Sequence, residues 1–295
     1  MTKGRMNSKI YKGIIYSAVC LIIFFGVVTF NRFFNGDSDF DTDKSFVCMI
    51  DVSQGDSTLI YSKGYAALID TGTQDNSNEV TECLKRCEIK RLDALLITHL
   101  DTDHIGGIDN VTDSVAVDYL ILPELSVESD GITLAELAVN KVVSSGGEAV
   151  TAKQGMNFDL GDFTVTVLEQ FSKMDSENNR SVITSAKIGD KSFLFTGDIE
   201  AKAERALLSE SLNLKSDVLK VAHHGSSSST ISEFLEAVSP KYAVISAGIN
   251  NRYGHPHSEV LSRLEKNCKE IYRTDLDGDV TFYVEDNKIK VKTEK

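Results

Sequence analysis

A short loop crowded with imidazole and carboxylate groups follows an apolar strand pattern at residues 92–97. The loop reads Thr-His-Leu-Asp-Thr-Asp-His-Ile-Gly-Gly at 98–107, and its two glycines allow the backbone to pass close to a bound group. A polar turn whose Asp and His cap the next helix is the simple alternative, but it does not explain four such groups within six residues. Imidazole combined with carboxylate suits Zn²⁺ or Mn²⁺. The predicted metal ligands are His99, Asp101, Asp103 and His104.

Two further polar clusters stand at the ends of predicted strands. Asp198 follows one of them and can bridge two cations about 3.5–4 Å apart, with a hydroxide between them. Taken alone, it would serve as the N-cap of a helix near 200–209. His223 and His224 follow the strand pattern at 218–222. Adjacent side chains point in different directions, so one of these two is a predicted ligand and the other a neighbour in the site.

The remaining histidines lie in a predicted loop, Tyr-Gly-His-Pro-His at 253–257. His255 and His257 can bind a phosphate or protonate a leaving group. All six histidines of the chain fall in these three clusters, whereas histidines that only fill a core would be scattered. The clustering therefore indicates one shared site.

Strand and helix patterns alternate from residue 46 onward in two halves, each rich in strands and interleaved with helices. This predicts an α/β protein with an αββα sandwich rather than a doubly wound Rossmann sheet. The expected strands are 46–52, 57–61, 65–70, 94–98, 119–122, 163–168, 182–188, 193–196, 218–222, 242–245 and 280–284. The expected helices are 78–87, 133–145, 200–209, 231–238 and 259–266.

The N-terminal part contains an uncharged run at 13–31, rich in Ile, Val, Leu and Phe. At ~1.5 Å per residue it approaches the ~30 Å hydrocarbon thickness of a bilayer. Basic residues precede it, so a cytoplasmic tail and single-pass anchor are predicted at 1–34, an acidic linker at 35–45, and an extracytoplasmic folded domain at 46–295. A cleaved signal peptide is the alternative and would leave a secreted protein, but no small-x-small cleavage site follows the run. A buried core helix would rarely lack a polar stripe.

Charge and cysteine content exclude some classes of protein. Beyond residue 34 there are 26 basic against 44 acidic residues, a net charge of −18. Such a surface is not a basic nucleic-acid clamp, although bound cations can reverse the sign locally. The five cysteines show no disulfide spacing. Cys83 and Cys87 lie four apart on a predicted helix, where packing is a simpler interpretation than a zinc pair.

Motifs along most of the soluble part resemble those of the extracytoplasmic metallo-β-lactamase-fold domain of ComEC-type DNA-uptake proteins, and are similar to those of phosphorylcholine esterases of that fold. The motifs are Asp-Val-Ser-Gln-Gly-Asp-Ser at 51–57, Ile-Asp-Thr-Gly at 69–72, the loop at 98–107, Thr-Gly-Asp at 196–198, Val-Ala-His-His-Gly-Ser at 221–226, Asn-Arg-Tyr-Gly-His-Pro-His at 251–257 and Ile-Tyr-Arg-Thr-Asp at 271–275.

The resemblance implies a centre with two divalent ions and assigns roles to individual residues. Asp56 and Asp70 would orient the ligands. Many members of the fold supply another histidine before the bridging Asp, yet none occurs here from 105 to 222, where Asn178, Asn179 or Ser181 stands instead. The ion at His99 and Asp101 is therefore expected to bind more weakly. The implied metal ligands are His99, Asp101, Asp103, His104, Asp198, His223 and His224. The implied catalytic residues are Asp103, His224 and His257, and the implied substrate-binding residues are Asn179, Ser226, Arg252 and His255.

The expected activity is that of a metal-dependent phosphodiesterase or nuclease, in which a metal-bound hydroxide attacks phosphorus. Its substrate would be single-stranded DNA or a component of the cell envelope. The alternatives are an esterase similar to the phosphorylcholine esterases and a non-catalytic module in which the metal only stabilises the fold. β-Lactam hydrolysis is less favoured, because Asp101 stands where those enzymes have a histidine. The chain lacks the many membrane spans of a DNA channel, so it is not expected to be the transporter itself.

Overall fold

The computed structural model describes residues 40–124 and 129–295. The predicted tail and anchor at 1–34 and the first part of the linker lie outside these residues. Within the described ranges, no helix has the length and apolar character needed to cross a bilayer. Thr42–Lys295 form one compact unit, and its first strand begins at Ser45, one residue before the predicted start of the domain.

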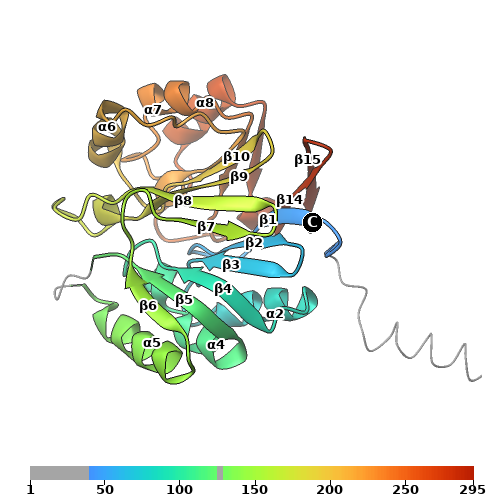
Figure 1. The fold of residues 1–295 in the computed structure, drawn as a ribbon. Helices are drawn as coiled ribbons and strands as arrows, with labels where there is room; N and C mark the ends of the chain where they lie inside the picture. The colour runs from blue at the N-terminus through green and yellow to red at the C-terminus, as the bar shows by residue number, and fades with distance from the viewer. Residues whose placement is uncertain (1–39, 125–128) are drawn as a thin grey trace, which may run out of the picture. The chain divides into compact units, whose positions relative to one another are not determined.

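Two mixed sheets face each other in the unit (Figure 1). The first has the strand order β15-β14-β1-β2-β3-β4-β5-β6 and the second has β13-β12-β11-β10-β9-β8-β7. The first sheet comprises β1 Ser45–Met49, β2 Thr58–Ser62, β3 Tyr65–Ile69, β4 Arg91–Leu96, β5 Ala116–Leu122, β6 Glu148–Thr151, β14 Val280–Glu285 and β15 Lys288–Thr293. The second comprises β7 Asn157–Leu160, β8 Phe163–Glu169, β9 Ile183–Ile188, β10 Lys191–Phe195, β11 Val218–Lys220, β12 Tyr242–Ile245 and β13 Glu270–Arg273.

Helices cover the outer face of each sheet, which confirms the predicted αββα sandwich (Figure 1). Those beside the first sheet are α2 Ser77–Arg86, α4 Ile108–Ser114 and α5 Ile132–Ser144. Those beside the second are α6 Ala201–Ser209, α7 Ser232–Val238 and α8 Ser258–Asn267. Short turns complete the chain: α3 Thr102–Ile105, the 3-10 turns η1 Asn178–Arg180 and η2 Ala222–Gly225, and α9 Thr274–Asp277.

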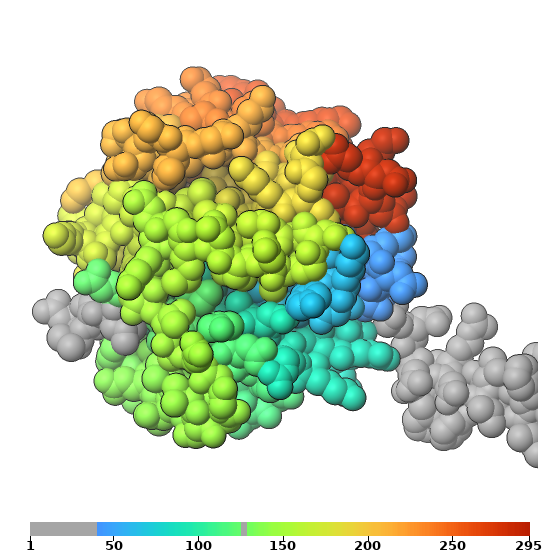
Figure 2. Space-filling model, viewed as in Figure 1, coloured from blue at the N-terminus to red at the C-terminus, as the bar shows by residue number. Residues whose placement is uncertain are grey.

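Side chains on successive strand residues point to opposite faces of a sheet, and this produces two apolar layers, one between the sheets and one beneath the helices. On β10, Phe193 and Phe195 pack between the sheets, while Leu194 points to the opposite face, against the helices. Phe193 meets Phe163 of β8 and Phe282 of β14 edge to face, so the central layer joins the two sheets. In the space-filling view, the yellow-green residues of β7 and β8 lie across the boundary between the two halves (Figure 2).

Several short or peripheral elements were not predicted. They are β6, β7, β13, β15 and α4. The first three contain only four residues each, too few for a clear period. In β15 lysines alternate with Ile and Val on an edge strand, a composition that protects an edge from further pairing but weakens the apolar signal. The strand predicted at 218–222 ends at Lys220, because the chain turns into η2 there.

A buried carboxyl group fixes the segment before α7 and gives a prediction on pH. Glu204 of α6 accepts the backbone N–H groups of Thr230, at 2.5 Å, and Ile231, at 2.9 Å. Burial raises the pKa of Glu204 from 4.5 to about 7, although the two N–H donors favour the ionised form. Between about pH 4.5 and 7, the Glu204 carboxyl is therefore ionised in the unfolded state but still protonated in the folded state.

The free energy of unfolding should consequently fall by about 3 kcal/mol as the pH rises through that window, and stay lower above it. Urea unfolding of wild type and Glu204→Gln at pH 4.5, 6 and 7.5 measures the effect, because the variant lacks this titration. A constant difference between the two proteins across that range would contradict the assignment.

Candidate metal centre

Loops that follow β4, β10 and β11 bring the three histidine- and aspartate-bearing segments together. The loop after β4 carries His99 and His104, both fully buried, and the loop after β10 carries Asp198. Asp101 stands at the N-cap of α3 and Glu200 at that of α6, but neither side chain makes a capping hydrogen bond. The simple capping interpretations of these clusters, including Asp198 as the cap of α6, are therefore wrong.

Asp198 lies at the middle of the cluster. Its Oδ2 atom is 3.4 Å from His104 Nε2 and 3.4 Å from His224 Nε2. His223 Nε2 is more distant, at 3.9 Å. Asp103 Oδ2 lies 3.3 Å from His224 Nε2. One carboxylate thus faces imidazoles from both sheets, as a group that bridges two ions must.

The hydrogen bonds of three imidazoles leave the Nε2 lone pairs directed to the centre. His104 Nδ1 donates to the Asp70 carboxylate at 2.8 Å, and His224 Nδ1 donates to the Ser246 carbonyl at 3.0 Å. Because Thr98 Oγ1 donates to Asp70 at 2.7 Å, it accepts from His99 Nδ1 at 3.1 Å. A metal-bound histidine has this arrangement, in which an acceptor on one nitrogen fixes the tautomer.

Four buried atoms in the centre have no hydrogen-bond partner among the described residues: the Nε2 atoms of His99, His104 and His224, and Asp198 Oδ1. Leaving such atoms unpaired costs about 1–3 kcal/mol each. A bound cation would satisfy them. The donor set, which mixes neutral imidazole with carboxylate, suits a divalent cation such as Zn²⁺ or Mn²⁺, so these residues fit the expected metal.

Charges in the centre favour a cation as well. Although burial opposes it, Asp198 and Asp56 raise the pKa of His224 to about 10, so these carboxylates hold on this ring a proton that a bound metal would displace. Burial also disfavours the Asp103 carboxylate, yet the His224 ring, with Nε2 3.3 Å from Asp103 Oδ2, and the charge of His104 hold its pKa well below the usual range. The carboxylates therefore stay ionised and create a negative field that attracts positive charge.

Asp56 and Asp70 lie behind the imidazoles, as predicted. Asp70 adopts a left-handed backbone conformation with φ +60° and accepts the Thr98 backbone N–H at 2.8 Å. Asp56 forms a buried ion pair with Lys220 at 2.6 Å, and its other oxygen lies 3.7 Å from His224 Nδ1. Lys220 was missed in the sequence, although a lysine inside the apolar strand pattern at 218–222 is an available signal.

The two adjacent histidines occupy different places. Both have left-handed backbones, with φ +50° at His223 and +52° at His224. A non-glycine residue pays about 1–2 kcal/mol for this conformation, and such strain gathers at functional sites. His224 is buried in the centre, whereas His223 lies at its rim, 3.7 Å from Glu200. The geometry favours His224 as the ligand.

The part of the centre around His99 has fewer donors. Asp101 is 3.7 Å from His99 Nε2 and is partly exposed. Ser181, one of the three residues expected in place of a further histidine, lies with its hydroxyl 3.3 Å from His99 Nδ1 and accepts the Asp198 backbone N–H at 3.1 Å. This arrangement agrees with a weaker second ion.

The predicted substrate-binding residues divide into two groups. Arg252 and His255 lie in the loop beside the centre, and the His255 ring is 6.1 Å from that of His224. Asn179 is buried, and its amide binds Ser176 and Glu200. Its prediction as a substrate ligand is therefore wrong, because both ends of the amide hold the loop before α6. Ser226 is also buried, and its hydroxyl forms a hydrogen bond with the Ser228 hydroxyl.

The loop after β10 requires glycine at position 197 for two reasons, its backbone conformation and the lack of space for a side chain. Gly197 has φ +50°, and a Cβ atom there would lie 2.8 Å from Ser181 Cβ. Gly197→Ala should lower the free energy of unfolding by about 2–4 kcal/mol, from backbone strain and overpacking together. Urea unfolding measures the loss. Gly146→Ala is the control, because Gly146 has φ +92° with open space around its Cβ; an equal loss in both variants would exclude the contact with Ser181.

The family model described as "Metallo-beta-lactamase superfamily" matches residues 50–249, which contain every candidate ligand. The chain belongs to the metallo-β-lactamase superfamily. The fold that the sequence predicted is thus that of this superfamily of metal-dependent hydrolases.

Relatives confirm the resemblance to competence proteins. The chain is 35% identical over 260 residues to ComE operon protein 3 of Bacillus subtilis, covering 80% of this chain and 32% of that protein. It is 31% identical to competence protein ComA of Neisseria gonorrhoeae, covering 81% and 32%. Recombination protein 2 of Haemophilus influenzae is 30% identical, with 78% and 28% covered. The chain therefore spans about a third of the length of these superfamily members.

Two solved structures show the same fold. The metallo-β-lactamase fold protein YhfI of Bacillus subtilis superposes with a TM-score of 0.54 at 13% identity, covering 82% of this chain and 100% of the other. CmlA of Streptomyces venezuelae, described as a diiron β-hydroxylase, gives 0.53 at 13% identity, covering 82% and 54%. At these identities the likeness concerns the fold alone.

Proposed function

We propose that the protein is a phosphodiesterase that requires divalent cations and acts on single-stranded DNA. The supporting observation is the convergence of three imidazole Nε2 atoms and Asp198 Oδ1, all buried and without hydrogen-bond partners among the described residues. The names of the relatives connect those proteins with competence and recombination, which favours a nucleic-acid substrate. Bound cations at this centre would neutralise phosphate charge and lower the pKa of a coordinated water.

Residues of the chain would orient the phosphodiester and hydrogen-bond its oxygens. Arg252 is exposed on the rim and close enough to Asp103 to interact with it electrostatically, so its guanidinium can pair with a phosphate oxygen. His257 Nδ1 accepts the Ser227 backbone N–H at 2.9 Å. Nε2 therefore carries the ring proton and can hydrogen-bond a phosphate oxygen or the leaving oxygen.

His255 has a different part in this proposal. Burial lowers its pKa to about 4, helped by the charges of His224, His223 and His257. A ring that is neutral at pH 7 is a poor proton donor. It can still hydrogen-bond the substrate or stack on it, because it lies parallel to Tyr253 with 5.5 Å between ring centroids.

A phosphorylcholine substrate is less favoured by the rim. A choline group needs open aromatic faces, and Tyr253 is the exposed aromatic residue of this loop. The Arg252 guanidinium already lies 4.8 Å from the centre of the Tyr253 ring. A second cation at this ring would be repelled, whereas an anion would be attracted.

Purified protein, freed of metal and reloaded with Mn²⁺ or Zn²⁺, should hydrolyse bis-p-nitrophenyl phosphate and single-stranded DNA. p-Nitrophenylphosphorylcholine belongs in the same panel as the rival substrate. Turnover of the choline ester alone would transfer the assignment to a cell-envelope esterase. If the reloaded protein bound a stoichiometric amount of metal but turned over none of these substrates, it would be a binding module in which the metal has a structural role.

We also propose that the catalytic unit lies outside the cytoplasm, held to the membrane by residues 1–34. The proposal rests on the uncharged run at 13–31 and the basic residues before it. Protease added to intact spheroplasts should then digest the unit, and washing with carbonate should not release it. Release into the medium would favour the cleaved signal instead.

A further inference from the structure

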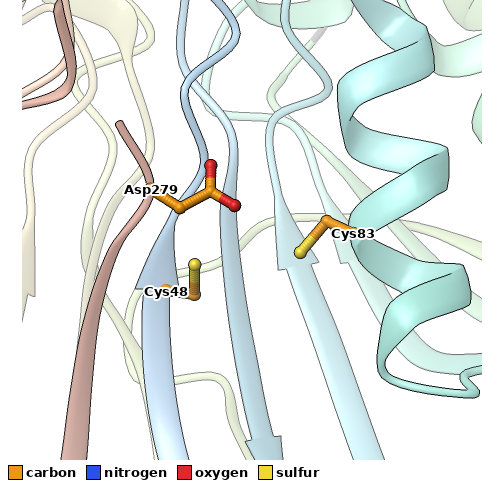
Figure 3. Close-up of side chains that lie close together, drawn as sticks. All are labelled: Cys48, Cys83 and Asp279. Carbon is orange, nitrogen blue, oxygen red and sulfur yellow. The ribbon is translucent and has the colours of Figure 1, made fainter. Parts of the chain in front are cut away.

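A second cluster of metal-binding side chains lies outside the candidate centre. Cys48 of β1, Cys83 of α2 and Asp279, just before β14, are all buried. One ligand atom of each, the two sulfurs and a carboxylate oxygen, lies within 4.8 Å of the others. Figure 3 shows the three side chains directed toward one another between β1 and α2. Their positions in the sequence are 35 and 196 residues apart, so only the fold reveals the cluster.

Charge and geometry fit a divalent cation of the zinc class. Zinc prefers tetrahedral sites with sulfur ligands at ~2.3 Å and carboxylate oxygens at ~2.0–2.2 Å, which requires only a modest contraction of this cluster. Arg86 donates to Asp279 Oδ2 at 2.6 Å, and the Asp51 backbone N–H donates to Oδ1 at 2.8 Å. Ligating carboxylates usually accept such bonds. Two thiolates, one carboxylate, Arg86 and a divalent cation together carry no net charge.

An acidic pocket adjoins the cluster at Asp279. The pocket measures about 430 Å³, and Asp279 belongs to its lining. Its other acidic side chains are Asp51, Glu79, Glu82 and Glu294, and Arg86 is its one lining cation among the described residues. A negative funnel raises the local concentration of cations, and an entry path is one criterion of a credible metal site. Cys87, one helical turn beyond Cys83 and in contact with it, is available as a fourth ligand.

We propose that Cys48, Cys83 and Asp279 form a structural site for a thiophilic divalent cation, separate from the candidate catalytic centre. The cation would join β1, α2 and the start of β14. These elements come from both ends of the folded unit, so its binding would add to the stability of the first sheet. The buried thiols would then be ligands and not merely small apolar side chains, which is their commoner use.

Cobalt distinguishes the two centres, because a thiolate bound to Co²⁺ gives a near-ultraviolet charge-transfer absorption that imidazole and carboxylate ligands do not give. The test uses the full-length protein with Cys20→Ser and Cys268→Ser, which leaves Cys48, Cys83 and the neighbouring Cys87 as its only thiols. Titration with Co²⁺ should produce this absorption and saturate at about one equivalent per chain. Further replacement of Cys48 or Cys83 by Ala should abolish it, whereas addition of Asp198→Ala should leave it unchanged.

Zn²⁺ should displace the cobalt and raise the melting temperature of the Asp198→Ala form, and Asp279→Asn should weaken the affinity for both ions. Absence of the charge-transfer absorption in the protein with an intact cluster would overturn the proposal without requiring any cluster variant to fold. A disulfide between Cys48 and Cys83, detected by mass spectrometry of the unreduced protein, would overturn it as well. Neither result depends on phosphodiesterase activity, so this site and the proposed function can fail independently.

Discussion

Replacement of Asp198 by alanine should lower kcat for bis-p-nitrophenyl phosphate by at least about 10³-fold, as the loss of a central electrostatic group does in other hydrolases. Asp198 Oδ2 lies 3.4 Å from the Nε2 atoms of both His104 and His224. Removing this carboxylate therefore takes a donor from any cation held by either imidazole. Steady-state kinetics and metal analysis of the dialysed protein measure the two losses together.

The matched control is Asp162→Ala, which removes an exposed carboxylate paired with Lys63. It should keep both turnover and metal content. If Asp198→Ala retained more than a tenth of the wild-type kcat with normal metal content, Asp198 would not bridge the ions, and the assignment of the centre would need revision.

Replacement of Lys220 by methionine should destabilise the protein by about 3–5 kcal/mol, a large share of the stability of a typical domain. The Lys220 and Asp56 side chains are 3% and 6% exposed, and their charged atoms lie 2.6 Å apart. Methionine preserves most of the volume of the lysine stem but leaves a buried carboxylate without its cation. Urea unfolding in the presence of a chelator measures this loss apart from any change in metal binding.

Two comparisons make this prediction specific. Lys63→Met breaks an ion pair of similar length, 2.7 Å, in which the side chains are 65% and 43% exposed, and should cost less than about 1 kcal/mol. In Lys220→Met combined with Asp56→Asn the uncompensated charge is gone, so part of the stability should return. A double variant as unstable as the sum of both single variants would show that the pair does not interact.

The sequence was sufficient for the central features of the fold and of the site. Runs such as 92–97 and 193–196 are apolar and end in unusual polar groups, so both the strand and the chemistry at its end could be predicted. His99, His104 and Asp198 met as expected because strand ends gather at one edge of each sheet, and the two sheets face each other.

Features that depend on contacts between distant segments could not be predicted. The amide of Asn179 is held by Ser176 and Glu200, and nothing in the local pattern shows that it turns away from the substrate. Cys83 was considered with its helical neighbour Cys87, while its nearest metal-binding partners are Cys48 and Asp279. The choice between His223 and His224 likewise required the left-handed turn that buries one ring and leaves the other at the rim.

The candidate ligands come from both halves of the sandwich, since His99 and His104 follow a strand of the first sheet and Asp198 and His224 follow strands of the second. Each half alone holds an incomplete set of donors, so tight capture of an ion must wait until the halves have docked. Ion uptake then reports completed folding, and partly folded chains would lack the assembled centre. The affinity for the ion would at the same time oppose separation of the halves.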